Sequence, residues 1–377
     1  MKKSVFAIYF SFFTSGIMCT IFGAILPFMS EEYSLSYGFS GTLLSAHQIG
    51  NLFAVLFAGV FPYFVGRKKS TIILGLGLII GFFLMMFTGN PIALLIAFVT
   101  SGISKGSLSN ISNVIISEEI ENKTAGLNIL HAIFAIGALV APFLVLLVTF
   151  TFYGWRLSTT ILIILQIISL IFIGKSDISN VPSTQTKTND DKDFLKSNIF
   201  WLNTAILFFY VCTEASVVGW LVTYFVKTEK MSFAFAQSST SFLWIMIMIG
   251  RIICASISNK VNKNLLLVIL ATAACIFFIL MLVSNNSALI ITGLLGVGFS
   301  MSGMYPTTLA TMPAKFNSST VATGTSIGVA TCGAVIMPVI VGFVAEKTGI
   351  AGGIATISIA FFCIMSLTII KLFIKKQ

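Results

Sequence analysis

The sequence has few charged residues. Only 9% of its 377 residues are Asp, Glu, Lys or Arg, while 57% are hydrophobic and the mean hydropathy is +1.02. A soluble domain carries about 25% charged residues, so this chain cannot cover itself with an ordinary water-facing surface. A membrane-spanning helix needs roughly 20 apolar residues, so about twelve such helices would use most of the chain. The composition therefore predicts an all-α polytopic membrane protein and leaves no room for a sizeable soluble domain.

The sequence also lacks the motifs of several other protein classes. It has no H-E-x-x-H, G-x-G-D or Ser–His constellation, so we expect neither an enzyme nor a metal site or cofactor. The net charge of +10 comes from Lys and Arg in short loops between apolar runs. We therefore interpret it as an orientation signal in a membrane and not as a nucleic-acid surface. None of the cysteines has C-x-x-C spacing, and all of them fall inside apolar runs: Cys19, Cys212, Cys254, Cys275, Cys332 and Cys363.

Turn residues and charges divide the apolar runs into twelve predicted transmembrane helices. Their approximate ranges are 5–29, 39–64, 70–89, 91–116, 125–150, 156–174, 198–226, 234–258, 264–284, 287–312, 319–345 and 351–371. The first run follows two lysines, as in a signal peptide. It continues past Pro27 without a small-residue cleavage site, so we expect it to be retained as the first span.

Lys and Arg predict how the chain is oriented. If the N-terminus is cytoplasmic, 16 of these residues fall on cytoplasmic loops and 4 on outer loops, as the positive-inside rule requires. Both termini then face the cytoplasm, and the number of spans is even. We expect a multi-pass protein of the plasma membrane, most simply a bacterial cytoplasmic membrane, that acts as a monomer within the lipid bilayer.

One segment differs in composition from the rest. Residues 175–197 are polar, poor in aromatics and mixed in charge, which predicts a mobile cytoplasmic linker. It separates residues 1–174 from residues 198–377, and each part holds six predicted spans.

The two parts share a short pattern. Residues 137–142 read G-A-L-V-A-P and residues 333–338 read G-A-V-I-M-P, so both fit G-A-x-x-x-P at an offset of 196 residues. At the same offset, the basic loop after the second span falls opposite residues 262–264. We therefore predict two pseudo-symmetric six-helix bundles. Parallel six-span repeats are a known transporter architecture, with the substrate site between the repeats near the membrane midplane.

Polarity is distributed in the same way in both parts. The third, sixth, ninth and twelfth spans are almost entirely apolar, as lipid-facing helices should be, while polar residues concentrate in the others. Because polar side chains in lipid are costly, these residues should face the bundle interior or a water-filled path.

The loop after the second span carries a family motif. Residues 59–68 read G-V-F-P-Y-F-V-G-R-K, which resembles the G-x-x-x-D-R-x-G-R-K signature of the major facilitator superfamily. Tyr63 stands where that signature has Asp. Gly154-Trp155-Arg156 is also common in the superfamily. The resemblance extends over essentially the whole chain and implies the major facilitator fold. It also implies a gating role for Gly66 and Arg67, with contacts that differ because the acidic residue is absent.

Four segments resemble one branch of this superfamily, the fucose–galactose–proton symporters and glucose permeases. They are L-N-I-L-H-x-x-F-x-x-G-A at 127–138, F-Y-V-x-x-E-x-x-x-x-x-W-x-x-x-Y at 209–224, G-R at 250–251 and G-x-G-x-S-x-x-G-x-Y-P at 296–306. This resemblance implies proton-driven import of a hexose or a related sugar.

Two charged residues fall deep within predicted spans. Glu214 is the one carboxylate there, and a carboxyl group in a poorly solvated site can load and release a proton. We predict a role in proton coupling, with a structural ion pair to Lys105 or Arg251 as the alternative. Lys105 lies halfway along the fourth span, where a charge costs about 2.5–3.5 kcal/mol on insertion scales. It is predicted to bind substrate, to attract an anion or to pair with Glu214.

Other candidates are polar or aromatic residues of the predicted interior. His47 and His131 are candidate proton relays, and His131 is also a candidate substrate ligand; hydrogen bonding between helices is the alternative. Arg251 is predicted to tie helix ends and to contribute to gating. The remaining candidates offer amides or rings to a sugar, with helix packing as the alternative: Gln48, Asn51, Asn113, Asn128, Tyr210 and Trp220.

The sequence thus predicts a secondary transporter with a small-molecule substrate and a proton as the coupling ion. Import of a monosaccharide or related sugar by alternating access is the preferred hypothesis. The alternatives are an organic-anion (sugar-acid) or drug transporter of the same fold, and a sensor that binds its ligand without moving it.

Overall fold

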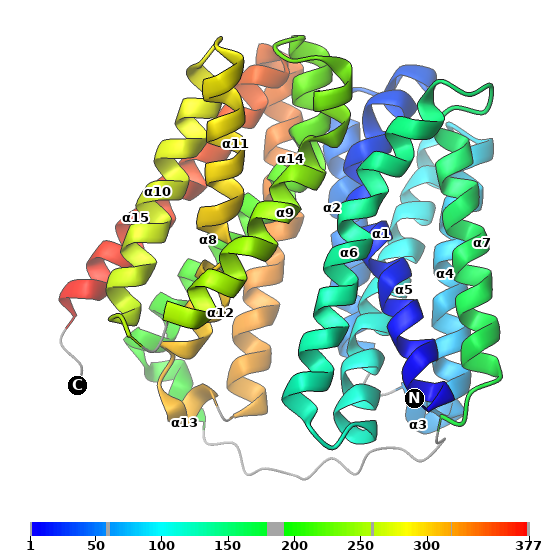
Figure 1. Cartoon of the computed structure of the whole chain (residues 1–377), viewed down its shortest axis with the longest axis horizontal. Helices are drawn as coiled ribbons and strands as arrows, with labels where there is room; N and C mark the ends of the chain where they lie inside the picture. The colour runs from blue at the N-terminus through cyan, green and yellow to red at the C-terminus, as the bar shows by residue number, and fades with distance from the viewer. Residues whose placement is uncertain (1, 58–60, 179–191, 258–259, 318, 375–377) are drawn as a thin grey trace. The chain divides into compact units, whose positions relative to one another are not determined.

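The computed structural model describes residues 2–57, 61–178, 192–257, 260–317 and 319–374, and this part of the chain is helical without β-strands. The chain divides into two compact units, Met1–Gln185 and Thr186–Gln377 (Figure 1). The division falls within residues 175–197, where the sequence predicts the linker. Residues 179–191 of that segment lie outside the described residues.

The first unit contains six long helices and one short one. They are α1 (Lys3–Glu32), α2 (Tyr37–Phe57), α3 (Phe61–Val65), α4 (Arg67–Phe87), α5 (Pro91–Glu119), α6 (Lys123–Thr149) and α7 (Trp155–Gly174). The predicted span 39–64 corresponds to α2 and α3, and residues 58–60 between them lie outside the described residues.

The second unit repeats this order with more interruptions. Its elements are the 3-10 helix η1 (Lys192–Lys196), α8 (Asn198–Thr228), α9 (Phe233–Ile257), α10 (Lys263–Val283), α11 (Ser287–Met301), α12 (Met304–Ala310), α13 (Ala314–Asn317), α14 (Thr320–Ala355) and α15 (Ile357–Phe373).

The described helices account for the twelve predicted spans. Ten segments are long and apolar enough to cross a membrane, and α2 adds a further 21-residue helix. The last of the ten segments, Val321–Phe373, holds two spans, because Gly349 has a left-handed backbone (φ 76°, ψ 167°) that breaks the helix. The twelve-helix fold predicted from the sequence is therefore confirmed.

Several equivalent helices of the two units begin at the offset seen in the sequence, as expected for a duplicated six-helix unit. Three pairs of starting residues lie 196 positions apart: Tyr37 and Phe233, Arg67 and Lys263, and Pro91 and Ser287. Asn90 and Asn286 have the same offset, and each caps its helix by accepting two backbone N–H bonds. The repeat is thus present in local structure as well as in the G-A-x-x-x-P pattern.

The G-A-x-x-x-P glycines lie where helix backbones approach closely. A Cβ on Gly137 of α6 would meet the carbonyl oxygen of Phe13 in α1, and a Cβ on Gly333 of α14 would meet that of Phe208 in α8. In Figure 1, α6 runs beside α1 and α14 beside α8. The pattern therefore marks the same helix contact in each unit.

The predicted peripheral helices α4, α7, α10 and α15 expose apolar faces. Exposed side chains on them include Ile80, Ile164, Ile276 and Ile359, each at least half exposed. These helices also carry buried polar residues that the sequence analysis missed, among them Gln166. Gln166 of α7 is fully buried, accepts a hydrogen bond from Thr14 and donates one to the carbonyl oxygen of Gly75.

The structure differs from the sequence prediction in two places. The predicted span 287–312 is interrupted at residues 302–303, because Pro306 has no N–H to donate to the carbonyl of Ser302. The predicted linker does not extend to residue 197 as a free segment. Its end forms η1, whose Phe194 is 3% exposed and packs edge-on against Phe200.

Candidate functional site

Two predicted residues of the second unit are brought together on α8. The Tyr210 hydroxyl donates to Glu214 Oε1 at 2.9 Å, as residues four positions apart on a helix can. Tyr210 is 1% exposed and Glu214 is half-buried. The Tyr305 ring of α12 lies 5.7 Å from the Tyr210 ring, centroid to centroid. Tyr305 belongs to a motif seen in the sequence, but it was not predicted as a site residue.

This pair leaves the Glu214 carboxyl without an ion pair among the described residues. Arg251 of α9 is exposed, and its charge acts on the Tyr210 hydroxyl without forming an ion pair with the acid. The structural alternative, in which Arg251 neutralises Glu214 directly, is therefore not the described arrangement. A carboxyl that has a phenol donor and no fixed cation can exchange a proton without breaking an ion pair.

The first unit places Lys105 beside a thiol. Lys105 of α5 is half-buried, and its Nζ lies 3.7 Å from Sγ of Cys19 in α1. Sulfur is a weak acceptor, so this contact compensates little of the cost of placing an ammonium group inside a helix bundle. Cys19 was not predicted as a site residue, since its distance from Lys105 along the chain gives no local signal.

His47 of α2 lies near Lys105. Its ring is 4% exposed, and its Nδ1 is 3.1 Å from Oγ of Ser101. Its Nε2 is buried and has no hydrogen-bond partner among the described residues. The ring packs on Phe22 and lies within electrostatic range of the Lys105 ammonium.

Glycines of α5 allow this close approach. A Cβ on Gly102 would meet the carbonyl oxygen of His47, and a Cβ on Gly106 would meet that of Asn51. The pattern Gly102-x-x-x-Gly106 therefore lets α2 and α5 pack backbone to backbone. Gln48 and Asn51, both predicted to bind substrate, are half-buried on α2.

The contacts described for the other predicted site residues of the first unit involve residues other than Lys105. Asn113 is half-buried and donates to the carbonyl oxygen of Ser109 in its own helix. Asn128 and His131 are exposed on α6, and the His131 ring lies edge-on to Phe12 at 5.5 Å. No hydrogen bond between these residues and Lys105 is present in the described part of the chain.

Trp220 lies in a packed position. It is fully buried in α8, and its indole N–H donates to the carbonyl oxygen of Pro338 in α14 at 3.3 Å. In this arrangement the indole packs between α8 and α14, as the packing alternative describes, and its role toward a sugar stays a prediction. Tyr210 is likewise buried, but its hydroxyl is held on Glu214.

Of the predicted gating residues, Gly66 lies between α3 and α4, and Arg67 begins α4. Gly66 has a positive φ of 84°, and Arg67 is 7% exposed. The Arg67 guanidinium forms a two-bond ion pair with the carboxylate of Glu118 at the end of α5. Glu118 was missed by the sequence analysis, which noted only that Tyr63 stands where the motif has its acid.

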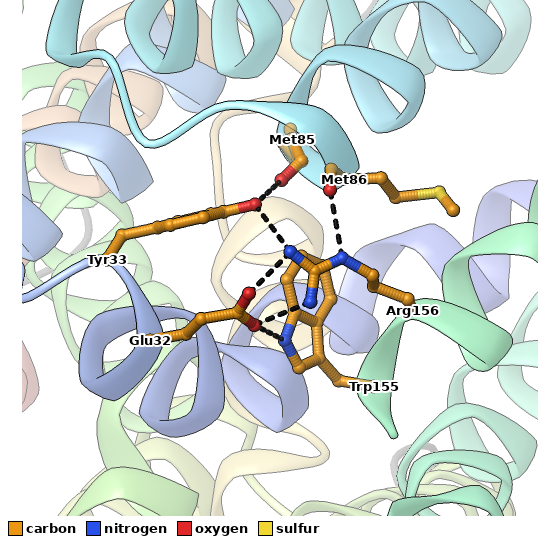
Figure 2. A network of polar contacts seen from close by, with 6 residues as sticks. All are labelled: Glu32, Tyr33, Met85, Met86, Trp155 and Arg156. Carbon is orange, nitrogen blue, oxygen red and sulfur yellow. Dashed lines mark hydrogen bonds and ion pairs between the residues drawn. The ribbon is translucent and has the colours of Figure 1, made fainter. Parts of the chain in front are cut away.

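At the opposite end of the first unit, the G-W-R segment anchors a polar network (Figure 2). The Arg156 guanidinium donates to Glu32 Oε2 at 2.7 Å, to the Met86 carbonyl at 2.9 Å and to the Tyr33 hydroxyl at 3.1 Å. The indole N–H of Trp155 also donates to Glu32, at 2.9 Å. Three helices, α1, α4 and α7, are joined in this way.

Tyr33 is both acceptor and donor in this network. Burial raises the pKa of its hydroxyl, which stays protonated and donates to the Met85 carbonyl at 2.8 Å. Tyr33 therefore connects the Arg156 guanidinium to the backbone of α4.

A second membrane lysine was missed. Lys371 of α15 was counted among the loop cations, but it is 2% exposed. Its Nζ donates to Asn203 Oδ1 of α8 at 2.6 Å and to Thr311 Oγ1, next to α12, at 2.5 Å. Lys371 stands near the end of an apolar run, so its position in the sequence does not distinguish a buried lysine from a loop cation.

Comparisons with known proteins agree with these features. The family model for the Major Facilitator Superfamily matches residues 8–330. The glucose/mannose transporter GlcP of Bacillus subtilis (strain 168) is 21% identical over 315 residues, which cover 80% of this chain and 77% of that protein.

Solved structures share the fold. A D-xylose–proton symporter has a TM-score of 0.79 at 13% identity, with 99% of this chain and 97% of that one covered. The nucleoside transporter NupG has a TM-score of 0.77 at 15% identity, with both chains covered completely. Together with twelve helices in two repeated units, the match over most of its length shows that the chain is a membrane transporter belonging to the Major Facilitator Superfamily.

Proposed function

We propose that this chain imports a monosaccharide or a closely related sugar derivative together with protons. The observation that carries the proposal is the Tyr210–Glu214 pair, a carboxyl group inside the bundle with a phenol donor and without an ion-pair partner among the described residues. The likeness to a glucose/mannose transporter and to a D-xylose–proton symporter supports the substrate class and the coupling ion.

The geometry suggests how coupling works. When Glu214 is ionised, it accepts the Tyr210 hydrogen bond; when it is protonated, it can itself donate to a substrate hydroxyl. Proton loading then removes a charge from the bundle interior and adds a donor to the site. A carrier that changes conformation most easily with Glu214 neutral couples sugar movement to the proton gradient.

Uptake into proteoliposomes tests this proposal. Purified protein in liposomes with an acidic outside should accumulate radiolabelled hexoses above the level of protein-free liposomes, and a protonophore should abolish accumulation. Glu214→Gln should retain exchange of labelled for unlabelled sugar but lose the effect of the pH gradient. Glu229→Gln, at an exposed position after α8, is the matched control and should behave like the parent.

Two outcomes would contradict the proposal. Absence of gradient-stimulated uptake for every sugar tested would remove the sugar-import function. Full gradient-driven accumulation by Glu214→Gln would assign coupling to another residue. Exchange without net transport would instead indicate uncoupled facilitation, and binding without exchange would indicate a sensor.

We further propose that the chain works as a monomer in a bacterial cytoplasmic membrane with both termini in the cytoplasm. The excess of Lys and Arg on the loops of that side supports this orientation. Single cysteines placed at residues 2 and 374 in a cysteine-free background should resist a membrane-impermeant maleimide in whole cells and react after permeabilisation. Labelling of either in intact cells would reverse the orientation.

A further inference from the structure

Lys105 is a cation without an acidic partner in its own unit. The one hydrogen bond that its Nζ makes to a described residue goes to Sγ of Cys19, at 3.7 Å. An ammonium group has three N–H donors, and a thiol satisfies one of them weakly. An ammonium group without an acidic partner inside a membrane bundle costs free energy, so a bound anionic ligand is the partner to expect.

The acidic residues of the first unit cannot supply that partner. All of them lie at helix ends or beyond: Glu31, Glu32, Glu118, Glu119, Glu121 and Asp177. Three already pair elsewhere, Glu32 with Arg156, Glu118 with Arg67 and Glu119 with Lys2. The span that carries Lys105 therefore has a positive charge in its middle and carboxylates only at its end.

A second buried group next to Lys105 also lacks a partner. Nε2 of His47 is buried without a hydrogen bond among the described residues, while Nδ1 is occupied by Ser101. The ring is within electrostatic range of the Lys105 ammonium, so both groups address the same region of the unit. The two unmet hydrogen-bonding groups come from different helices, α5 and α2, that are held together by Gly102 and Gly106.

We infer that Lys105 and His47 form a subsite for a carboxylate, so that the transported sugar derivative is a sugar acid. The carboxylate oxygens accept from the Lys105 ammonium. Ser101 Oγ donates to the Phe98 carbonyl, so Nδ1 of His47 donates to Ser101, and Nε2 accepts from a hydroxyl of the same sugar acid. Cys19 holds the ammonium in place when no ligand is bound. This inference rests on the proposed function and names the substrate class for the same site.

Paired ligands of matched size test the subsite. Binding of D-glucuronate, D-gluconate and D-glucose is measured on purified protein in nanodiscs by calorimetry, and uptake of the same three by proteoliposomes. We expect the parent protein to prefer an acid to glucose, and Lys105→Gln to reduce that preference by about 10- to 100-fold, the range expected for one charge-assisted contact. Lys105→Arg should retain part of it. Lys123→Gln, at an exposed residue that begins α6, is the matched control.

Charge-selective labelling gives a readout that does not depend on the ligand. In a variant whose only cysteine is Cys19, the thiolate attacks the sulfenyl sulfur of a methanethiosulfonate reagent, a mixed disulfide forms and methanesulfinate leaves. An anionic 2-sulfonatoethyl reagent should react faster than a cationic trimethylammonioethyl reagent because Lys105 attracts the anion. Lys105→Gln should cancel this ratio, and a bound sugar acid should slow labelling.

The outcomes separate this inference from the proposed function. Uptake of neutral hexose together with equal acid binding by the parent and Lys105→Gln would overturn the subsite and leave sugar import standing. Lys105-dependent binding of other organic acids, without uptake of any sugar, would support the subsite and overturn sugar import. A monodisperse elution profile and an unchanged melting temperature for Lys105→Gln exclude misfolding as the cause of lost binding.

Discussion

The Lys371 contact gives a prediction in which two substitutions at one hydrogen bond have different effects. Lys371 is 2% exposed and Asn203 is fully buried, and Nζ is 2.6 Å from Asn203 Oδ1. Asn203→Ala removes this acceptor and leaves a buried ammonium with Thr311 as its one remaining described partner. A hydrogen bond to a charged group contributes about 1.5–3 kcal/mol, and the small cavity adds about 1 kcal/mol, so we expect a loss of about 2–4 kcal/mol.

Lys371→Met should cost much less. It removes the charge itself, keeps the length of the side chain and leaves Asn203 Oδ1 accepting from Thr311 Oγ1 at 3.3 Å. Replacing a buried charge by an apolar side chain of similar volume is often neutral or stabilising, so a change within about 1 kcal/mol is expected. In the Lys371→Met background, Asn203→Ala should cost about 2 kcal/mol less than in the parent chain.

Thermal and chemical unfolding of the four proteins in the same detergent measures this cycle. Unfolding is followed by intrinsic fluorescence without added ligand, so that only the stability of the folded proteins is compared. Equal costs of Asn203→Ala in both backgrounds would refute the reasoning, since they would show that the ammonium does not depend on the amide. A large loss on Lys371→Met would indicate that the charge itself, and not its satisfaction, stabilises α15.

Three smaller predictions follow from the other contacts. Arg156→Lys should lower the free energy of unfolding by about 1–2 kcal/mol in the same assay, because an ammonium cannot reproduce the forked contact with Glu32. The partial exposure of both side chains limits the loss. An unchanged melting temperature would contradict this prediction. Gly333→Leu should prevent folding of the second unit or lower its yield strongly, because even a Cβ at this position would meet the carbonyl oxygen of Phe208. A monodisperse variant that still binds ligand would show that the two helices do not approach this closely. Glu118→Gln should lower the free energy of unfolding by about 1 kcal/mol or less, because the Glu118 side chain is 45% exposed and Gln can still accept a hydrogen bond from Arg67. Loss of the folded protein would show a larger structural role for Glu118.

The fold was predictable because its signals are local and repeated. Apolar runs of helix length, turn residues between them and the 196-residue offset are each visible without knowledge of contacts. The capping residues Asn90 and Asn286 carry the same offset into the structure. What the sequence did not reveal was the break at residues 302–303, where Pro306 removes one backbone bond inside an otherwise apolar run.

Contacts within one helix were also accessible from the sequence. Tyr210 and Glu214 are four residues apart on α8, so helical geometry places their side chains within reach of each other, although their hydrogen bond was not among the predictions. Contacts between helices were not. Cys19 approaches Lys105 across 86 positions and Glu118 meets Arg67 across 51, and neither distance leaves a pattern in a single sequence.

The two membrane lysines show why charge alone does not identify a site. Lys371 and Lys105 have the same chemistry, and composition gives no reason to treat them differently. Lys371 is enclosed by an amide and a hydroxyl oxygen at hydrogen-bond distance, so its charge is satisfied by the fold and its role is structural.

Among the residues that the structure describes, Lys105 contacts only the Cys19 thiol, and it is half-buried with N–H donors that no described residue accepts. The difference between the two residues lies in their unmet hydrogen bonds, which the helix packing determines and which the sequence does not encode locally. No described carboxylate of its own unit pairs with Lys105. In the subsite proposed above, a carboxylate on the transported molecule takes the place of such an acceptor, which gives a reason for a cation in the middle of α5.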